Sequence, residues 1–431
     1  MSLTSLLRKE AAKLGLTIRE KIGNGAMSEG VFLSDRLDTG EKVALKVTAM
    51  GPLDLSVHIF PKPKLIPVYI GYQDEEPLPN DLCQPAQISV INEDTSDLAR
   101  RGRHQVHVFD SITAEDHDLE YRLRQSVASR ECIRILEEKE KDQGTNLVVR
   151  YKGDQFFTGE GFLYHALQME HLEQLGLDQL MPDAVELNRK LSPQSVYNIA
   201  AQLCRLLQLT EESRIVHLDL KPGNIAVNPY DTSVKVLDFD LAVLLDGKCH
   251  PDNPEDVGHL IRKFSLKEDR LAGTPFYIAP EVVERYCRRQ RREELPEMTT
   301  LPDVFSVGRI IAEMTGALVG ERADNLRWIY NFPRFTNQHR DAAVRRIMES
   351  GYDFTVAGAV AEMLDEDPRH RSYQRGLEVF SDRAIPGYSL LADAFTRLNP
   401  NQPMFEAPHS YSQTAFADTV SIKAAFRQQR S

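Results

Sequence analysis

The stretches Ile-Val-His-Leu-Asp-Leu-Lys-Pro-Gly-Asn-Ile-Ala-Val (215–227) and Val-Lys-Val-Leu-Asp-Phe-Asp-Leu-Ala (234–242) decide the fold of this chain. Each places acidic or amide side chains in a tight loop between short apolar strands. Asp219 can accept a proton from an attacking hydroxyl, and Asn224 and Asp238 offer the oxygen ligands that Mg²⁺ prefers. The two loops can therefore line one polar pocket; the alternative is a pair of hairpins with Asx turns.

Together these stretches resemble the catalytic segments of protein kinases, and the resemblance extends through most of the chain. Val-Ala-Leu-Lys at 43–46 matches the strand motif whose lysine, here Lys46, binds nucleotide phosphates. Ile-Gly-Asn-Gly-Ala-Met-Ser at 22–28 matches the start of the loop that covers the phosphates, where glycines let the backbone approach oxygen atoms. The third glycine position holds Ser28, and the Ala-Met-Ser form is closer to bacterial serine/threonine kinases than to most eukaryotic ones.

The resemblance also implies a partner for Lys46 and a site for adenine. A carboxylate from the next helix should pair with Lys46, and the segment 129–136 makes Glu131 the candidate. Met-Glu-His-Leu at 169–172 resembles the hinge between the lobes, whose backbone groups would bind the base. The rival glutamates are Glu120, Glu137 and Glu138. The implied ATP-binding residues are Ile22, Gly23, Gly25, Val31, Ala44, Lys46, Met169, Glu170, Leu172, Asn224 and Asp238, of which Asn224 and Asp238 are also the implied Mg²⁺ ligands.

Later segments indicate a protein substrate rather than a small molecule. Gly-Thr-Pro-Phe-Tyr-Ile-Ala-Pro-Glu at 273–281 resembles the end of the activation segment of serine/threonine kinases. By the same resemblance, its Glu281 should pair with Arg371, and Asp303 should anchor the backbone of the catalytic loop.

The catalytic set implied by the resemblance is Asp219, Lys221, Lys46 and Glu131. Lys221 suits transfer to serine or threonine, because a lysine there can neutralise the γ-phosphate. Thr274 should lie near Asp219 and Lys221. The expected activity is therefore that of an ATP- and Mg²⁺-dependent serine/threonine protein kinase that also phosphorylates itself.

Two positions depart from the family pattern. Leu218 replaces the arginine that usually precedes the catalytic aspartate and reads a phosphorylated activation loop, so activity should not depend strictly on such phosphorylation. Asp240 replaces the glycine of the Asp-Phe-Gly triplet and should bias the position of Phe239. Its carboxylate could touch the metal site, but we favour a side chain that points to the surface.

Periodicity predicts an α+β, bilobal architecture, with a β-rich lobe at 1–172 and a helical lobe at 173–390. We expect an insertion at about 51–118 and an extended tail at 391–431, both of which are possible partner-binding regions. The predicted helices cover 5–15, 119–141, 192–212, 302–318, 341–350, 356–364 and 372–382, and the predicted strands lie within 17–48 and at 146–151 and 162–169.

Composition narrows the class of protein. The 431 residues include 52 Lys and Arg against 64 Asp and Glu, a net charge of −12, which argues against a nucleic-acid binder. No apolar run is long enough to span a bilayer, and five scattered cysteines favour a reducing compartment. We expect a cytoplasmic protein, acting either in a bacterial cytoplasm or in a host cell as an effector.

Two other functions remain open at this point. His-Leu-Asp-Leu-Lys-Pro-Gly-Asn at 217–224 also resembles the motif of aminoglycoside and choline kinases, which act on small molecules but lack the 273–281 segment. A pseudokinase scaffold that binds nucleotide without catalysis is the third possibility, because Ser28 and Asp240 are unusual.

Overall fold

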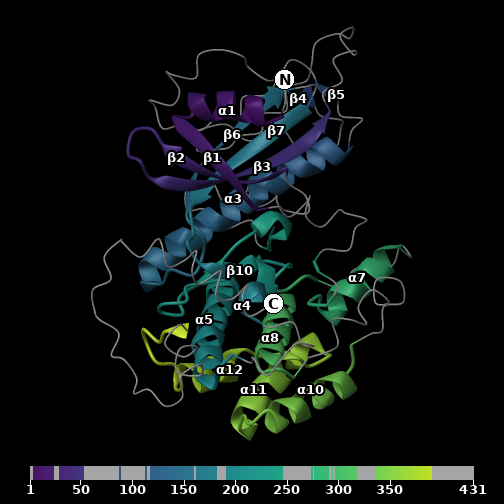
Figure 1. Ribbon diagram of the computed structural model, residues 1–431. Coiled ribbons are helices and arrows are strands. Elements are labelled where there is room, and N and C mark those ends of the chain that lie inside the picture. Colours follow the sequence, from purple (N-terminus) through teal and green to yellow (C-terminus); the bar gives the residue numbers. More distant parts are fainter. Residues whose placement is uncertain are drawn as a thin grey trace, which may run out of the picture.

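The computed structural model divides the chain into a lobe built on a sheet and a lobe built mainly on helices (Figure 1). It describes residues 3–23, 29–52, 87–88, 112–113, 117–159, 162–181, 191–245, 273–274, 276–290, 294, 297–317 and 335–390. This is the bilobal α+β fold that the sequence predicts. Within the described residues, no helix combines the length and the apolar character needed to cross a membrane.

Most of the predicted insertion at 51–118 and all of the predicted tail at 391–431 lie outside the described residues. Inside the insertion, β4 (Gln87–Ile88) pairs with β5 (Ile112–Thr113) as an antiparallel pair.

Five antiparallel strands form the sheet of the first lobe, in the spatial order β1, β2, β3, β7, β6. The strands are β1 (Leu16–Gly23), β2 (Gly30–Arg36), β3 (Lys42–Pro52), β6 (Tyr151–Gly159) and β7 (Phe162–Glu170). The first three form the meander that the sequence predicts within 17–48. Because β3 lies in the middle, both of its edges are paired and its position in the lobe is fixed.

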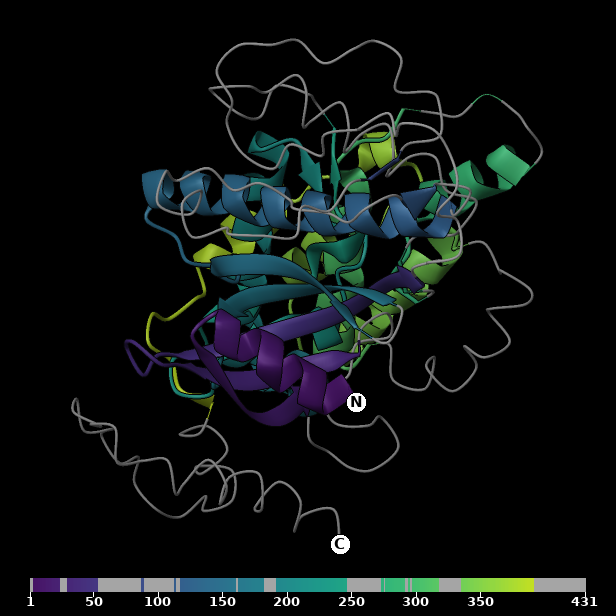
Figure 2. The same ribbon diagram turned by 90° about the horizontal axis from the view of Figure 1, so that it is seen from above.

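The alternation of side chains along β3 decides on which face of the sheet each of them lies. Leu45 and Val47 are buried in the cluster beneath α1 (Leu3–Lys13), on one face of the sheet. Successive side chains of a strand point to opposite faces, so Lys46 faces the other side. That side is covered by α3 (His117–Gln143), and the sheet lies between the two helices (Figure 2).

The loop after α3 takes the place of most of the strand predicted at 146–151. Leu147 donates its backbone N–H to the buried carboxylate of Glu140, and Tyr151 donates its own to Glu137 at 2.5 Å. Side chains of α3 thus satisfy amides that a strand would pair with a neighbour. The strand β6 accordingly begins only at Tyr151.

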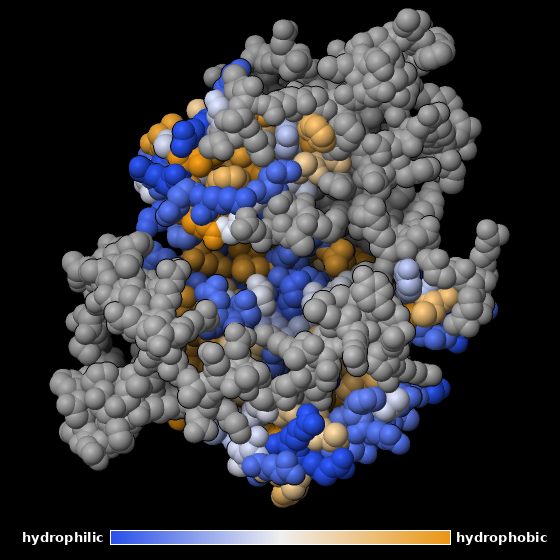
Figure 3. Space-filling view, turned by 45° about the vertical axis from the view of Figure 1, so that its right-hand side comes forward, coloured by the Kyte–Doolittle hydropathy of each residue, from blue (hydrophilic) through white to orange (hydrophobic). Residues whose placement is uncertain are grey.

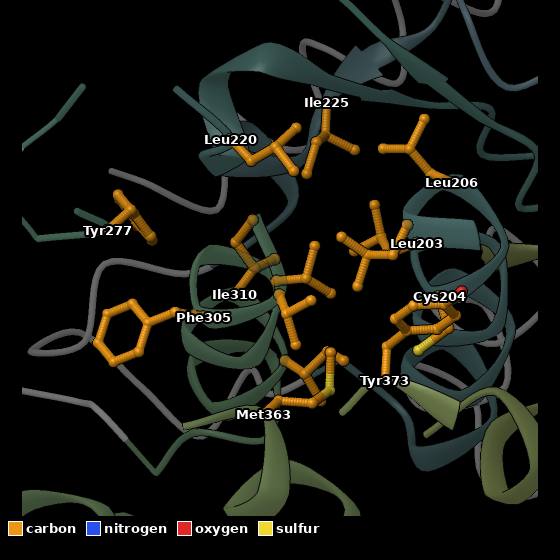
Figure 4. Packing of buried hydrophobic residues seen from close by; sticks show 14 of the residues in the cluster. Leu203, Cys204, Leu206, Leu220, Ile225, Tyr277, Phe305, Ile310, Met363 and Tyr373 are labelled. Carbon is orange, nitrogen blue, oxygen red and sulfur yellow. The ribbon is translucent and has the colours of Figure 1, made fainter. Parts of the chain in front are cut away.

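Helices build the second lobe and share one apolar core. They are α4 (Leu177–Leu180), α5 (Pro193–Glu212), α7 (Pro280–Gln290), α8 (Leu301–Met314), α10 (Asn337–Glu349), α11 (Phe354–Met363) and α12 (Gln374–Ser381). As predicted, α5 follows a Ser192 cap, whose side chain accepts a backbone N–H of the first turn. Leu203 of α5, Ile310 of α8 and Met363 of α11 converge in the core (Figure 4).

Five short strands bring the two polar loops together. They are β8 (Leu175–Gly176), β9 (Ile215–Val216), β10 (Ile225–Val227), β11 (Val234–Val236) and β12 (Val243–Leu244). Since β10 pairs with β11 and β9 pairs with β12, the segment 217–224 must lie beside the segment 237–242. Each segment contains one turn of 3₁₀ helix, η1 (Pro222–Asn224) and η2 (Phe239–Leu241).

Candidate active site

The loop at 217–224 is held by one buried carboxylate. Asp303, near the start of α8, accepts the N–H of His217 at 2.6 Å and that of Leu218 at 3.0 Å. These bonds hold Leu218 at a φ of 64°, which a bulky side chain rarely adopts. Burial raises the pKa of Asp303 to about 6, although the charge of His217 and the two N–H donors act in the opposite direction. The predicted anchoring role of Asp303 is confirmed.

Asp219 lies at the centre of a hydrogen-bond network. Its Oδ1 accepts the hydroxyl of Thr274 at 2.6 Å, and its Oδ2 accepts Lys221 Nζ at 2.7 Å and Asn224 Nδ2 at 3.1 Å. Lys221 also donates to the Thr274 hydroxyl at 2.9 Å, so Thr274 lies where the sequence predicts. A carboxylate that already takes a hydroxyl donor at this distance has the geometry of a general base for an alcohol.

Lys46 reaches this region from the first lobe and contacts two carboxylates. Its Nζ lies 2.6 Å from Oδ1 of Asp238 and 2.6 Å from Oδ2 of Asp240. Burial acts to lower the pKa of Lys46, but the two carboxylates outweigh burial and the pKa is raised. Burial acts to raise the pKa of Asp238, yet the charge of Lys46 prevails and lowers it. For Asp240 burial prevails, and its pKa is raised.

The turn that carries Asp238 is fixed by an aromatic contact and a hydrogen bond. The rings of His217 and Phe239 lie 4.6 Å apart, and Phe239 is fully buried. His217 Nε2 lies 3.0 Å from the carbonyl oxygen of Leu237. Asp238 itself has a φ of 64°, a left-handed conformation that Asp tolerates better than most residues. The turn aims the Asp238 carboxylate at β3.

Glu281, at the end of the segment 273–281, forms an ion pair with Arg371 of the helical lobe. Arg371 Nη1 lies 2.5 Å from Oε1 of Glu281, and the arginine side chain is completely buried. Its Nε also donates to the carbonyl oxygen of Asp365 at 2.6 Å. The predicted pair of Arg371 and Glu281 is confirmed.

A comparison with known families agrees with this geometry. Residues 122–375 match the family described as protein kinase domain. This chain belongs to the protein kinase family. The matched range includes Asp219, Asn224 and Asp238, and Lys46 precedes it in the sequence.

Among individual proteins, similarity covers only part of each chain. The chain is 30% identical over 161 residues to mitogen-activated protein kinase 12 of Homo sapiens, which is 37% of this chain and 36% of that protein. It is 29% identical over 186 residues to serine/threonine-protein kinase ULK3 of Rattus norvegicus, 42% of this chain and 32% of that protein. The chain thus spans well under two thirds of either relative. The bacterial character of the loop at 22–28 stays a prediction.

The predicted pair of Lys46 and Glu131 is wrong. Glu131 is buried on α3, where its Oε1 accepts Arg130 Nη2 at 2.6 Å and Arg134 Nη1 at 3.4 Å. Arg130 in turn lies 3.7 Å from Asp154 on β6, which fixes this part of the kinase helix to the sheet. Two neighbouring guanidinium groups on its own helix therefore occupy Glu131.

The prediction that Asp240 points to the surface is also wrong. Besides Lys46, the Asp240 carboxylate accepts the Ser129 hydroxyl of α3 at 3.4 Å. Sequence reasoning therefore missed Asp240 as a site residue. The signal was present, because an acid that replaces the family glycine two residues after Asp238 is close enough to share its partner.

The implied nucleotide-binding residues lie around Lys46 in the kinase sheet. Val31 on β2 is opposite Lys46, and Gly23 on β1 is opposite Val31. Ala44 is opposite Met169 near the end of β7. The implied base-binding residues therefore lie two residues along β3 from Lys46. The register therefore gathers these positions from four separate sequence segments.

The four remaining implied positions lie in different surroundings. Glu170 uses its side chain to link the lobes, since its Oε1 lies 2.7 Å from Lys235 Nζ on β11. Leu172 lies two residues beyond the end of β7. Ile22 is 43% exposed at the end of β1. Gly25 lies outside the described residues.

The donor set at this site suits a magnesium–nucleotide complex. Asn224 directs its amide nitrogen to the carbonyl oxygen of Asp219 at 2.8 Å, which leaves its amide oxygen for a cation. Asp238 adds a carboxylate oxygen, and Lys46 adds a cation for phosphate. On the face shown in Figure 3, hydrophobic residues gather between the two lobes beside hydrophilic residues of the helical lobe.

Proposed function

We propose that this chain is an ATP- and Mg²⁺-dependent serine/threonine protein kinase that also phosphorylates itself. The observation that carries the proposal is the convergence of Lys46 and Asp238 from different lobes at 2.6 Å, beside a loop whose Asp219 already accepts a hydroxyl. Phosphoryl transfer needs little covalent chemistry from the protein, so positioning and charge do most of the work. Both are supplied here by side chains of the expected type.

In this proposal, the nucleotide is held from both lobes. Lys46 binds phosphate oxygens, while Asn224 and Asp238 hold Mg²⁺. When bound, Mg²⁺–ATP supplies the γ-phosphoryl group and neutralises charge that develops during transfer. The residues that surround the nucleotide are Ile22, Gly23, Gly25, Val31, Ala44, Met169, Glu170 and Leu172.

Asp219 accepts the proton of the substrate hydroxyl, and Lys221 balances negative charge beside it. The contact of Asp219 with the Thr274 hydroxyl supports this assignment, because an incoming serine or threonine presents the same group. Lys221 lies 2.7 Å from the same carboxylate, which orients Asp219. The segment 273–281, which the small-molecule kinases lack, favours a protein substrate.

The test is transfer of label from ATP by the intact chain and an Asp219→Ala variant in the presence of Mg²⁺. We expect label on serine or threonine of protein, and roughly a 10³-fold loss of the rate in the variant. Label only on an added small alcohol would support an aminoglycoside- or choline-type kinase instead. Nucleotide binding without turnover would support a pseudokinase scaffold. Mapping of phosphorylated residues on the wild-type chain tests self-phosphorylation.

Leu218 further leads us to propose that activity does not require a phosphorylated activation segment. Its side chain is packed into the apolar core, where it offers no charge to a phosphate. Alanine variants of Ser265, Thr274 and Tyr277, made separately, test this with the labelled-ATP assay. Loss of activity at Ser265 alone would contradict it, because Thr274 and Tyr277 make structural contacts of their own.

We also propose a cytoplasmic place of action and partner binding through the insertion at 51–118 and the tail at 391–431. These two regions are the part of the chain that the catalytic scaffold does not use. Deletion of the tail, followed by a comparison of activity on a general substrate and on a physiological one, tests its role: only the second activity should fall.

A further inference from the structure

Asp240 occupies a position from which it can orient Lys46 throughout a catalytic cycle. Its carboxylate lies 2.6 Å from Lys46 Nζ and 3.4 Å from the hydroxyl of Ser129 on α3. We infer that Asp240 is the positioning residue for Lys46, in place of a carboxylate from α3. This inference rests on the proposed function, since it concerns how the nucleotide site is held.

The lysine faces more negative charge than it can balance. One amine faces Asp238 and Asp240, which leaves one negative charge unmatched and available to a cation. The Asp238 side chain is 38% exposed and that of Asp240 only 22%, so Asp238 is the more accessible of the two. If Asp238 turns to Mg²⁺, Asp240 is the ion-pair partner that remains to Lys46 among the described residues.

Among the α3 side chains that the structure describes, Glu131 does not substitute for this pair. Glu131 is occupied by Arg130 at 2.6 Å, and breaking that buried pair would leave the guanidinium only a longer contact with a carboxylate. Arg130 also lies 3.7 Å from Asp154, whose Oδ2 lies 3.1 Å from His165 Nε2. These contacts fix α3 to the sheet independently of Lys46. The helix touches the site instead through the hydroxyl of Ser129, which donates to Asp240.

The first experiment measures how fast an acylating reagent modifies Lys46, by mass spectrometry and without nucleotide. Because Asp238 also contacts the lysine, the comparison is made in an Asp238→Asn background. There, Lys46 should remain protected within about threefold of wild type, and adding Asp240→Asn should speed its modification roughly tenfold. Adding Glu131→Gln instead should change nothing. Lys235, buried near Glu170 on another element, reports whether each variant stays folded.

Two results of this experiment overturn the inference. One is full loss of Lys46 protection in the Asp238→Asn background alone, and the other is loss of protection on Glu131→Gln. Either would show that Asp240 does not hold the lysine. Because no catalysis is measured, this result stands whether or not the chain proves to be a kinase.

The second experiment measures the affinity of single variants for a fluorescent ATP analogue with Mg²⁺. We expect Asp240→Asn to weaken binding roughly tenfold, with Asp240→Glu and Glu131→Gln within about threefold of wild type. A fall for Glu131→Gln that matches Asp240→Asn, or no rescue by Glu at 240, counts against the inference. A wild-type chain that binds no nucleotide would contradict the proposed function, whereas the labelling experiment would still decide the pairing.

Discussion

The catalytic loop and the lysine strand face each other, yet they are held in different ways. The loop at 217–224 is fixed by N–H groups of its own backbone that donate to Asp303, a residue of the same lobe. Lys46 is fixed by side-chain ion pairs to Asp238 and Asp240, which belong to the other lobe. The first arrangement survives any change in the angle between the lobes, and the second does not.

The two regions should therefore contribute differently to stability and to activity. Backbone anchoring in a buried place contributes to the folded state as well as to the chemistry, so damage there should reduce stability and activity together. The Lys46 side chain is only 11% exposed, but it faces two carboxylates, so the loss of one of them still leaves it an ion pair. Damage there should reduce nucleotide binding and leave the free energy of unfolding nearly unchanged.

The strongest test of the comparison is Asp303→Ala. The change leaves two buried N–H groups without an acceptor, which should lower the free energy of unfolding by about 2–5 kcal/mol. Leu218 would be released from its left-handed conformation, so the rate of transfer should fall as well. Denaturant unfolding and the labelled-ATP assay measure the two effects.

A matched control for Asp303→Ala is Asp341→Ala on α10. Asp341 is 54% exposed and pairs only with Arg340 in the described residues, so its loss should cost less than about 1 kcal/mol. Equal losses for the two variants, or a fall in activity without a fall in stability for Asp303→Ala, would remove the distinction between the two regions.

The pH dependence of stability isolates the ionisation of Asp303. Its pKa in the folded state is about 6, above the value of roughly 3.9 for an unfolded chain, because burial disfavours the charge. Between these values only the folded state keeps the proton, so rising pH should lower the stability of wild type relative to Asp303→Asn. The difference should change by at most about 3 kcal/mol between pH 4 and pH 7.

Urea unfolding of both proteins across that range makes the measurement, since other carboxylates cancel in the difference. A relative stability that rises with pH would mean that the N–H groups of His217 and Leu218 outweigh burial and lower the pKa. The hydrogen bonds from the two N–H groups would then stabilise the charged form of Asp303 by more than burial destabilises it.

A smaller loss of stability is expected from Gly273→Ala. This change in the activation segment brings a Cβ too close to the loop at 217–224. Gly273 has a φ of 104°, and a Cβ there would lie 2.5 Å from the carbonyl oxygen of Leu218. We expect a loss of about 2 kcal/mol in stability and a lower rate of transfer, because Thr274 is displaced next to Asp219. Gly40→Ala is the control: its φ is 69°, but the added Cβ would meet no atom within 4 Å. Equal losses would show that backbone strain, not contact with the loop, is responsible.

The loop side of the site could be predicted from the sequence almost completely. Asp219, Thr274, Asp303 and the pair of Glu281 and Arg371 lie where the motifs place them. Short strands of two or three residues hold those loops, so the geometry follows from local sequence. The fold followed for a similar reason, because alternation in β3 and the Ser192 cap of α5 are local signals.

The lysine side could not be predicted to the same depth. The partner of Lys46 depends on competition among carboxylates from distant segments, and sequence alone does not show that Arg130 and Arg134 occupy Glu131. The same competition explains the strand predicted at 146–151, where glutamates of α3 accept the backbone N–H groups of Leu147 and Tyr151. In both cases a side chain from another element satisfied a group that a local pattern assigned elsewhere.

The smallest expected effect comes from Ser129→Ala, which removes the contact between α3 and Asp240. The hydrogen bond is long, at 3.4 Å, so its loss should weaken binding of the ATP analogue about two- to threefold, equivalent to roughly 0.5 kcal/mol. Asp240 keeps its pair with Lys46 in this variant, and the free energy of unfolding should not change measurably. Ser372→Ala, in the helical lobe away from the site, also removes one hydroxyl contact and is the matched control; it should leave binding of the ATP analogue unchanged. If Ser129→Ala weakened binding as much as Asp240→Asn, the helix would be orienting the lysine, and the contrast between a lobe-anchored loop and a carboxylate-held lysine would have to be redrawn around α3.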